Sequence, residues 1–431
     1  MFRRLALGVA VLISVIIATV AITAYLQVEP SDGVHPPEVP DKGGGTNRTV
    51  MMGLIAGSNS SAPRLLYAAK RGLDEVNAHC QTLGLPWRFD IVEYIAPDPL
   101  TQTEVIQNLN AEGVKIMFCE WNSPICSFQT YITLHNITMI GVPDSHCRSH
   151  KQIDSVYRMS PNTTEETEAL AETLRANGVK AVIVLRDSYS YEYLSTILPR
   201  EGTDFEEVME IIHDHTEAEP SVWQDQDAER SRAFMDEVNT KLNELLQRYE
   251  PSEVGVVYSF SYVNENLVKE IASHGELQSV TWYTTPLYYA NQTLMLSHSD
   301  VFAKIHFLSL SLSKPGGDEY LFLEEGYEGS SLYTFDGVPL GSKEAALYDA
   351  VKVASLAVIE SGSTQGEDLQ SEISIVATNY VGATGNMALD ANGDRMGSDF
   401  DIYGYYDVGG SIQWVIAGHY DSKTGETELF S

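Results

Sequence analysis

The sequence predicts an α/β protein of two lobes, each built on a parallel sheet covered by helices. From Thr49 onward, short apolar runs alternate with amphipathic stretches, as strands alternate with helices in such sheets. The same alternation restarts at Thr163, which indicates a second unit of the same kind. The chain has 431 residues and is 43% hydrophobic, so two domains with real cores are expected.

The first unit contains four expected strands and three expected helices. Pro63 opens the first helix, and Ser123 followed by Pro124 predicts an N-cap and a first helical position. The strands are expected at 49–56, 88–95, 114–118 and 137–142, and the helices at 63–80, 101–113 and 123–136.

The second unit repeats this rhythm, and a mixed segment follows it. Helices are expected at 163–178, 190–198, 227–249 and 263–275, with strands at 179–185, within 204–213, and at 252–260 and 277–284. Two further helices are expected around Phe302–Ser311 and Lys343–Ser361. Residues 399–420 alternate and turn at "DVGG", which predicts a β-hairpin.

The N-terminal residues predict the compartment. Leu5–Tyr25 contains no charged residue and has about the ~20 apolar residues that cross a bilayer. Arg3 and Arg4 should stay in the cytoplasm. We therefore expect residues 1–27 to be an uncleaved transmembrane anchor and the Pro/Gly-rich residues 28–47 to be a tether. The protein would be a single-pass protein of the cell membrane with its ligand-binding domain extracellular or periplasmic; a cleaved signal peptide, giving a secreted protein, is the alternative.

The glycosylation acceptors support an outside location. Five N-x-[ST] acceptors occur, at Asn47, Asn59, Asn136, Asn162 and Asn291. Outside the cell, Cys80, Cys119, Cys126 and Cys147 are able to form two disulfides, in one of three pairings. Their spacing fits no zinc pattern. The net charge of −33 argues against nucleic acid as a partner.

The late stretch "GATGNMALDANGDR", Gly382–Arg395, looks at first like a calcium loop. Asp390, Asn392 and Asp394 alternate oxygen-bearing side chains. The sixth position, where such a loop needs Gly, is Arg395, and the twelfth is Asp401 in place of Glu. We therefore predict a tight turn with Asn392-Gly393 as its central pair, and no metal or cofactor.

As a turn, this stretch resembles the C-terminal signature of type I periplasmic binding proteins of the branched-chain amino-acid (Leu/Ile/Val) class, the substrate-binding proteins of ABC transporters. That signature reads Gly-x-Thr-Gly, then Asp-x-Asn-Gly-Asp, then a Tyr-rich extended segment. The segments 53–78, 177–194 and 346–363 resemble other parts of the same family. The resemblance implies two lobes joined by a three-strand hinge, closing on a small solute. The lobes would be 48–156 plus 288–397, and 157–287 plus 398–431.

The resemblance also implies the ligand contacts. Family members hold the ligand carboxylate with hydroxyls and backbone N–H groups of the first lobe and cover it with aromatic rings of the second. The matching positions here are Asn122, Ser123, Pro143, Asp144, Ser145, Tyr191 and Tyr262. A plain N-cap role for Ser123 and interior packing for the two tyrosines are the alternatives.

One departure concerns the ligand. Members that bind amino acids keep a carboxylate after the strand that here ends in "VTWY", where this chain has Thr284, Thr285 and Pro286. A buried ammonium would lack its partner there. One interpretation is that Glu120 or Asp144 replaces this carboxylate as the partner of the ligand ammonium, with Thr285 as a neutral ligand contact. The other is that the ligand is an amide, a urea-like solute or a carboxylate.

No motif predicts an enzyme. The chain has no G-x-S-x-G, H-E-x-x-H, P-loop or C-x-x-C, so we expect no catalytic residues. The expected function is capture of a small polar solute (amino acid, amide or urea-like) by hinge closure and its delivery to an ABC permease. The alternative is a membrane-anchored sensory ectodomain for a similar ligand.

Overall fold

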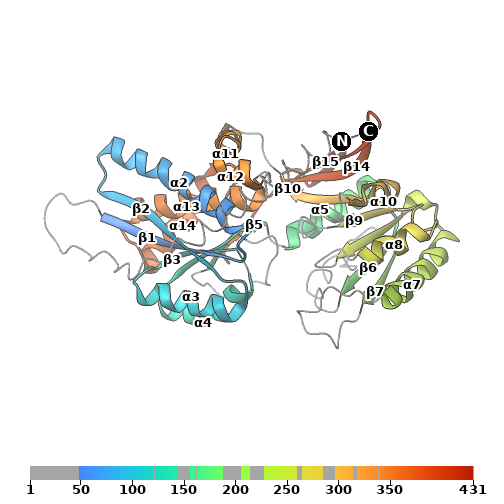
Figure 1. Ribbon diagram of the computed structural model, residues 1–431, viewed down its shortest axis with the longest axis horizontal. Helices are drawn as coiled ribbons and strands as arrows, with labels where there is room; N and C mark the ends of the chain where they lie inside the picture. Colours follow the sequence, from blue (N-terminus) through green and yellow to red (C-terminus); the bar gives the residue numbers. More distant parts are fainter. Residues whose placement is uncertain are drawn as a thin grey trace, which may run out of the picture. The chain divides into compact units, whose positions relative to one another are not determined.

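The computed structural model shows two parallel α/β sheets with their helices (Figure 1). It describes residues 48–120, 122–142, 156–161, 163–187, 205–213, 228–259, 265–284, 297–313, 318–336 and 340–430. The predicted anchor and tether lie outside these ranges. Among the described residues, no helix has the length and apolar character needed to span a bilayer.

The first sheet and its helices are called here the first module. Its six strands run parallel in the order β13 (Asp394–Arg395), β5 (Val156–Pro161), β4 (Thr138–Gly141), β3 (Ile116–Cys119), β1 (Arg48–Ala56) and β2 (Trp87–Ile95). One face packs on α2 (Ala62–Leu83), α13 (Ser342–Ser361) and α14 (Gly366–Asn379). The other face packs on α3 (Pro99–Ala111) and α4 (Asn122–Leu134). A smaller cluster adds α11 (Asp318–Glu328) and α12 (Ser331–Asp336), and β11 (Val381–Gly382) pairs with β12 (Gly385–Asn386).

The second sheet and its helices form the second module. Its order is β16 (Glu426–Leu429), β15 (Ser411–Asp421), β14 (Phe400–Val408), β10 (Leu308–Leu312), β9 (Thr281–Thr284), β8 (Val254–Ser259), β6 (Ala181–Asp187) and β7 (Glu207–His213). The strands from β10 to β7 are parallel, and the hairpin strands β14, β15 and β16 are antiparallel. One face packs on α7 (Ala228–Leu246), α8 (Glu265–Ser273) and α10 (Ser299–Lys304), and the other on α5 (Thr163–Ala176). A short 3₁₀ turn, η2 (Pro251–Glu253), precedes β8.

The chain passes between the sheets three times, after β5, after β10 and after β13. The predicted lobe boundaries differ from these points. β5 extends to Pro161 in the first sheet, and β10, which the boundary at 288 gives to the first lobe, pairs with β9 and β14 in the second. The helix expected at Phe302–Ser311 is wrong in its second half. Helix α10 ends at Lys304, and Leu308–Leu312 is a fully buried strand between two neighbours.

The cysteines do not form the two expected disulfides. Cys80 on α2 is a buried free thiol in the core on one face of the first sheet. Cys119 at the end of β3 lies in the core on the opposite face. Cys80 and Cys119 therefore do not meet, and two disulfides that use all four cysteines are excluded by the free Cys80 thiol.

Candidate ligand-binding edge

The predicted contact residues fall mostly outside the described ranges. Pro143, Asp144, Ser145, Tyr191, Tyr262 and Thr285 are in this group. Asn122 and Ser123 lie in the first turn of α4, which begins at Asn122, two residues earlier than an N-cap role for Ser123 would place it. Such boundaries vary by a residue or two.

What the structure does describe is the carboxyl edge of β1 and β3, which are neighbours in the first sheet. Glu120 follows β3 and is buried, and its carboxylate accepts a hydrogen bond from the backbone N–H of Gly57 at 2.6 Å. It also accepts from the Ser61 hydroxyl at 2.7 Å and pairs with the Lys343 ammonium at 3.1 Å. These three donors compensate the charge that burial would otherwise penalise. The Glu120 carboxylate is therefore already bound by groups of the protein, so it is not expected to pair with the ammonium group of a ligand.

Serine hydroxyls line the same edge after β1. The Ser58 hydroxyl lies 2.9 Å from the hydroxyls of both Ser60 and Ser61, and it accepts the Ser61 N–H at 3.1 Å. Asn59 and Ser60 are exposed, while Ser61 is buried against Glu120. The edge thus exposes neutral hydrogen-bond donors and acceptors to solvent, while the charges of Glu120 and Lys343 neutralise each other next to them.

Helix α13 contributes the other half of this edge. Lys343 and Glu344 occupy its first turn, and Glu344 accepts the Gly341 N–H at 2.8 Å in a capping arrangement. Glu344 also pairs with Arg64 of α2 at 3.2 Å. Sequence reasoning did not find Lys343, because its partner Glu120 is 223 residues away in the chain. The run "GSNSSAP" after a buried strand was the only local signal for the serines.

The late motif is a turn, as predicted. Asp390 Oδ1 accepts the backbone N–H groups of Asn392 at 2.7 Å and Asp394 at 2.9 Å, and Gly393 has φ +77°. The Asp394 carboxylate pairs with Arg158 of β5 at 2.6 Å. These carboxylates are therefore used by the chain itself. No group of three or more metal-ligating side chains occurs among the described residues.

Arg395 fixes the third crossing. It is 1% exposed, and its guanidinium donates to the Asn386 carbonyl at 3.1 Å, the Met159 carbonyl at 3.2 Å and the Thr384 hydroxyl at 2.9 Å. It also donates to the Thr384 carbonyl. Burial lowers the pKa of Arg395, while nearby Asp349 raises it. These four hydrogen-bond acceptors are all neutral.

Two carboxylates with perturbed pKa values surround this arginine. Asp349 of α13 accepts the backbone N–H groups of Ala383 and Thr384, both at 2.8 Å, and burial raises its pKa to about 6. Glu165 of α5 accepts the Gly397 N–H at 2.6 Å, and burial raises its pKa to about 7 against the hydrogen bond and the Arg395 charge.

The crossings contact one another. Arg395 pairs with Pro161 at the end of β5, and the Ser313 N–H, after β10, donates to the Asp399 carbonyl at 2.8 Å. With the Glu165–Gly397 bond, the first crossing meets the third and the third meets the second. The third crossing therefore contacts both of the others.

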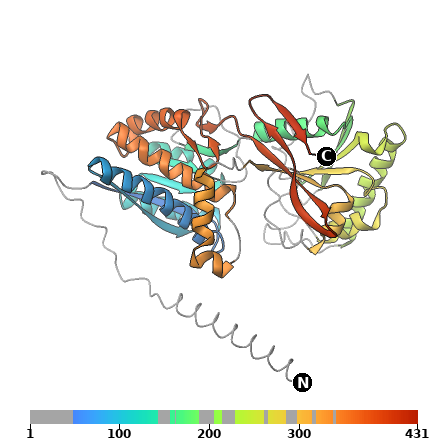
Figure 2. The same cartoon turned by 90° about the horizontal axis from the view of Figure 1, so that it is seen from above.

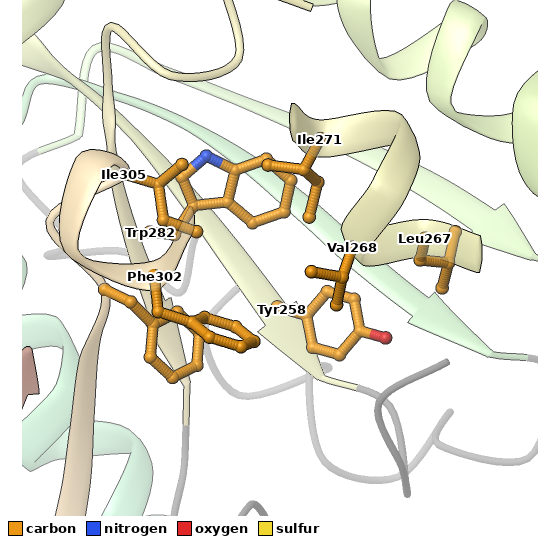
Figure 3. Close-up of a pocket in the computed structure, with 8 residues that line it drawn as sticks. Tyr258, Leu267, Val268, Ile271, Trp282, Phe302 and Ile305 are labelled. Atoms are coloured by element: carbon orange, nitrogen blue, oxygen red, sulfur yellow. The ribbon is translucent and has the colours of Figure 1, made fainter. Parts of the chain in front are cut away.

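A small cavity in the second module is not a ligand site. Its volume is about 10 Å³, roughly the space of one water molecule. Only apolar and aromatic side chains line it (Figure 3), among them Tyr258, Val268, Trp282 and Phe302. It is a packing gap in the core between β8, β9, α8 and α10.

Comparison with known proteins agrees with this architecture. Residues 66–407 match the family model described as the receptor family ligand binding region. The chain belongs to this family. No curated protein sequence matches it.

Solved structures share the fold of this receptor-family ligand-binding region. An ABC transporter substrate-binding protein from Desulfitobacterium hafniense, in complex with Leu, is 13% identical, with a TM-score of 0.60 over 85% of this chain and 100% of that one. The leucine-binding protein LivK of Thermotoga maritima is 15% identical, with a TM-score of 0.59 over 85% of this chain and 97% of that one. The resemblance to type I periplasmic binding proteins is thus confirmed for family and fold.

Proposed function

We propose that this protein captures a small polar solute outside the cytoplasm and delivers it to an ABC permease. The family match over residues 66–407, on two sheets crossed three times by the chain, is the observation that carries the proposal. The two structural neighbours bind leucine or are named for it, which favours an amino acid or a related solute. No described feature favours catalysis, and the family is defined by ligand binding.

The polar edge of the first module narrows the ligand class. The Glu120 carboxylate is bound by Lys343, Ser61 and Gly57. If the ligand is an amino acid, its ammonium group would therefore pair with Asp144. Thr284 ends β9 as a buried neutral residue where amino-acid binders keep a carboxylate. An amide or a urea-like solute needs no such charge, and these ligands therefore stand beside amino acids in the proposal.

Hinge closure is the proposed mechanism of capture. The third crossing contacts both of the others, and crossings linked in this way form a compact place at which the relative orientation of the modules can change. A ligand that contacts both modules would favour the closed form by its extra contacts there. Small-angle scattering should show a smaller radius of gyration with saturating ligand; an unchanged radius would contradict closure.

We further propose that residues 1–27 anchor the protein and that its ligand-binding region lies outside the membrane. The uncharged run Leu5–Tyr25 after Arg3 and Arg4 supports this. Anchoring would raise the effective concentration of the protein near a permease. A sensory ectodomain is the second candidate, supported by the receptor character of the family. Ligand uptake by vesicles carrying a permease would favour transport.

A thermal-shift screen is the first test. Asn47–Ser431 is a compact unit, so it can be purified alone. A ligand at about 100 times its Kd stabilises the folded state by about 2.7 kcal/mol. We expect a raised melting temperature with an amino acid, an amide or a urea-like solute. Sugars serve as controls, and a screen without any shift would refute the proposed ligand class.

The double variant Ser123→Ala, Ser145→Ala tests the predicted carboxylate contacts. Each hydroxyl bond to a charged group contributes about 1.5–3 kcal/mol, so affinity should fall by about 100-fold or more. Titration calorimetry measures this with the ligand found above. The exposed pair Ser273→Ala, Ser371→Ala is the matched control and should leave affinity unchanged. Equal affinity in both variants would remove the two serines from the site.

A further inference from the structure

The hairpin β14–β15, red in Figure 2, carries an unusual strand edge. β15 pairs with β14 along its length, but β16 covers it only from Gly418 to Asp421. One further backbone bond runs from Phe430 to the Ala417 carbonyl. Within the part of the chain that the structure describes, no strand pairs with Ser411–Ile416 on this side. This segment is called here the open edge.

The open edge lacks the usual protection against pairing with another chain. Natural edge strands carry charges or proline, whereas "SIQWVI" has neither. Between Ile402 and Gly418 the only charged residue is Asp407, although the chain as a whole has a net charge of −33. Ile412 is 37% exposed and Ile416 46% exposed. An uncharged, apolar edge on so acidic a protein indicates a contact surface.

The open edge is also rigid. Trp414 is half-buried, and its ring lies 4.6 Å from the ring of Tyr405 and stacks on Tyr403 at 5.8 Å. Tyr405 in turn stacks on Phe302 of α10 at 5.9 Å. A strand held in this way loses little conformational entropy when a partner strand pairs with it.

The sequence of the open edge is self-complementary. Ile412-Gln413-Trp414-Val415-Ile416 places its large residues as I-x-W-x-I, which reads the same in both directions. Antiparallel pairing of two copies about a two-fold axis at Trp414 sets Ile412 opposite Ile416 of the second copy. Side chains alternate between faces, so the three large residues share one face and meet their counterparts directly.

We propose that the open edge Ser411–Ile416 joins two copies of this chain by antiparallel strand pairing, so that the two second sheets form one continuous sheet. A two-fold contact uses the same patch on both copies, as the palindromic spacing requires. The absence of charge at the edge lets two acidic chains meet there without an unpaired buried carboxylate. This interface is independent of the proposed ligand and permease.

The salt dependence distinguishes this interface from one built on ion pairs. Each copy carries a net charge of −33, so the copies repel one another at long range. Raising the salt from about 0.15 M to about 1 M shortens the Debye length from about 8 Å to about 3 Å. Dimerisation should therefore become tighter with salt, whereas an ion-paired interface would weaken.

Sedimentation of Asn47–Ser431 over a range of concentrations measures the dimer. The variant Ile412→Lys, Ile416→Lys should be monomeric at every concentration and salt. The control Ile375→Lys, Val381→Lys adds the same charge at exposed apolar positions of the first module and should dimerise like the original chain. Since added lysines reduce the net negative charge, loss of the dimer in the first variant alone would locate the contact.

Hydrogen exchange supplies a readout that needs no variant. Within Ser411–Ile416, the backbone N–H groups that point away from β14 should exchange more slowly at high protein concentration, while those of the edge strand β2 should not change. A chain that stays monomeric in high salt, or a dimer that persists in the Ile412→Lys, Ile416→Lys variant, would overturn the proposal. Binding of the edge to lipid vesicles by a monomeric chain would overturn it as well, because the edge would then serve a membrane.

Discussion

Replacing Arg395 by methionine is expected to lower the free energy of unfolding by about 3–5 kcal/mol, the range for breaking a buried, hydrogen-bonded charge. Methionine fills a similar volume but leaves the Thr384, Asn386 and Met159 carbonyls without their donor. It also removes the positive charge near Asp349 and Glu165. Urea denaturation of the Asn47–Ser431 unit gives the value.

The control for this variant is Arg248→Met. Arg248 pairs with Glu207 on the surface of the second module, where its side chain is 51% exposed. Exposed ion pairs contribute about 0–1 kcal/mol, so this variant should change stability little. A similar decrease in the free energy of unfolding in both variants would mean that the buried hydrogen bonds of Arg395 stabilise the protein no more than an exposed ion pair does.

The folded state is expected to gain stability as the pH falls from about 8 to about 5. Burial raises the pKa of Glu165 to about 7 and of Asp349 to about 6, above their values in the unfolded chain. The folded state therefore binds more protons than the unfolded state in this window, and proton uptake favours folding. This stabilisation is fully present below the unfolded pKa values and is lost as the pH rises through the folded ones. One unit of pKa shift corresponds to about 1.4 kcal/mol, so the two groups together give a gain of a few kcal/mol.

Melting temperatures across this pH range test the expectation. Glu165→Gln keeps the side-chain shape and the acceptor for the Gly397 N–H, but its amide cannot titrate. In this variant the melting temperature should therefore depend less steeply on pH above pH 6. The control Glu367→Gln replaces an exposed carboxylate in the same way and should leave the pH dependence of the melting temperature unchanged. A stability that instead falls steadily on acidification would contradict the raised pKa values.

Most elements with a regular apolar pattern could be predicted from the sequence. The hairpin turning at Gly409-Gly410 and the strands β1, β3, β6 and β8 follow from local periodicity. β5 could not be predicted, because its sequence "VYRMSP" places Arg158 in a buried strand. The charge is tolerated only because Asp394 neutralises it, and a contact of this range leaves no local pattern.

The candidate site was predictable only in outline. The serine-rich loop after β1 stood out, while the Lys343–Glu120 pair depends on the folded arrangement of α13 against β3. The error at Phe302–Ser311 has a similar origin. "VFAKIHFLSL" has apolar spacing compatible with helix and strand alike, and the strand is selected by the two neighbours between which Leu308–Leu312 is buried.

The Arg158–Asp394 pair also determines when the first module can be completed. The two residues are 236 positions apart, and β13 adds the last strand of a sheet whose first strand begins at Arg48. At a synthesis rate of about 5–20 residues per second, β5 waits on the order of tens of seconds for its partner. The module that contains the start of the folded chain is thus finished after the parallel strands of the other module have been made. During that interval β5 is an unpaired edge strand of the first sheet, and an unpaired edge of this kind is a template for aggregation.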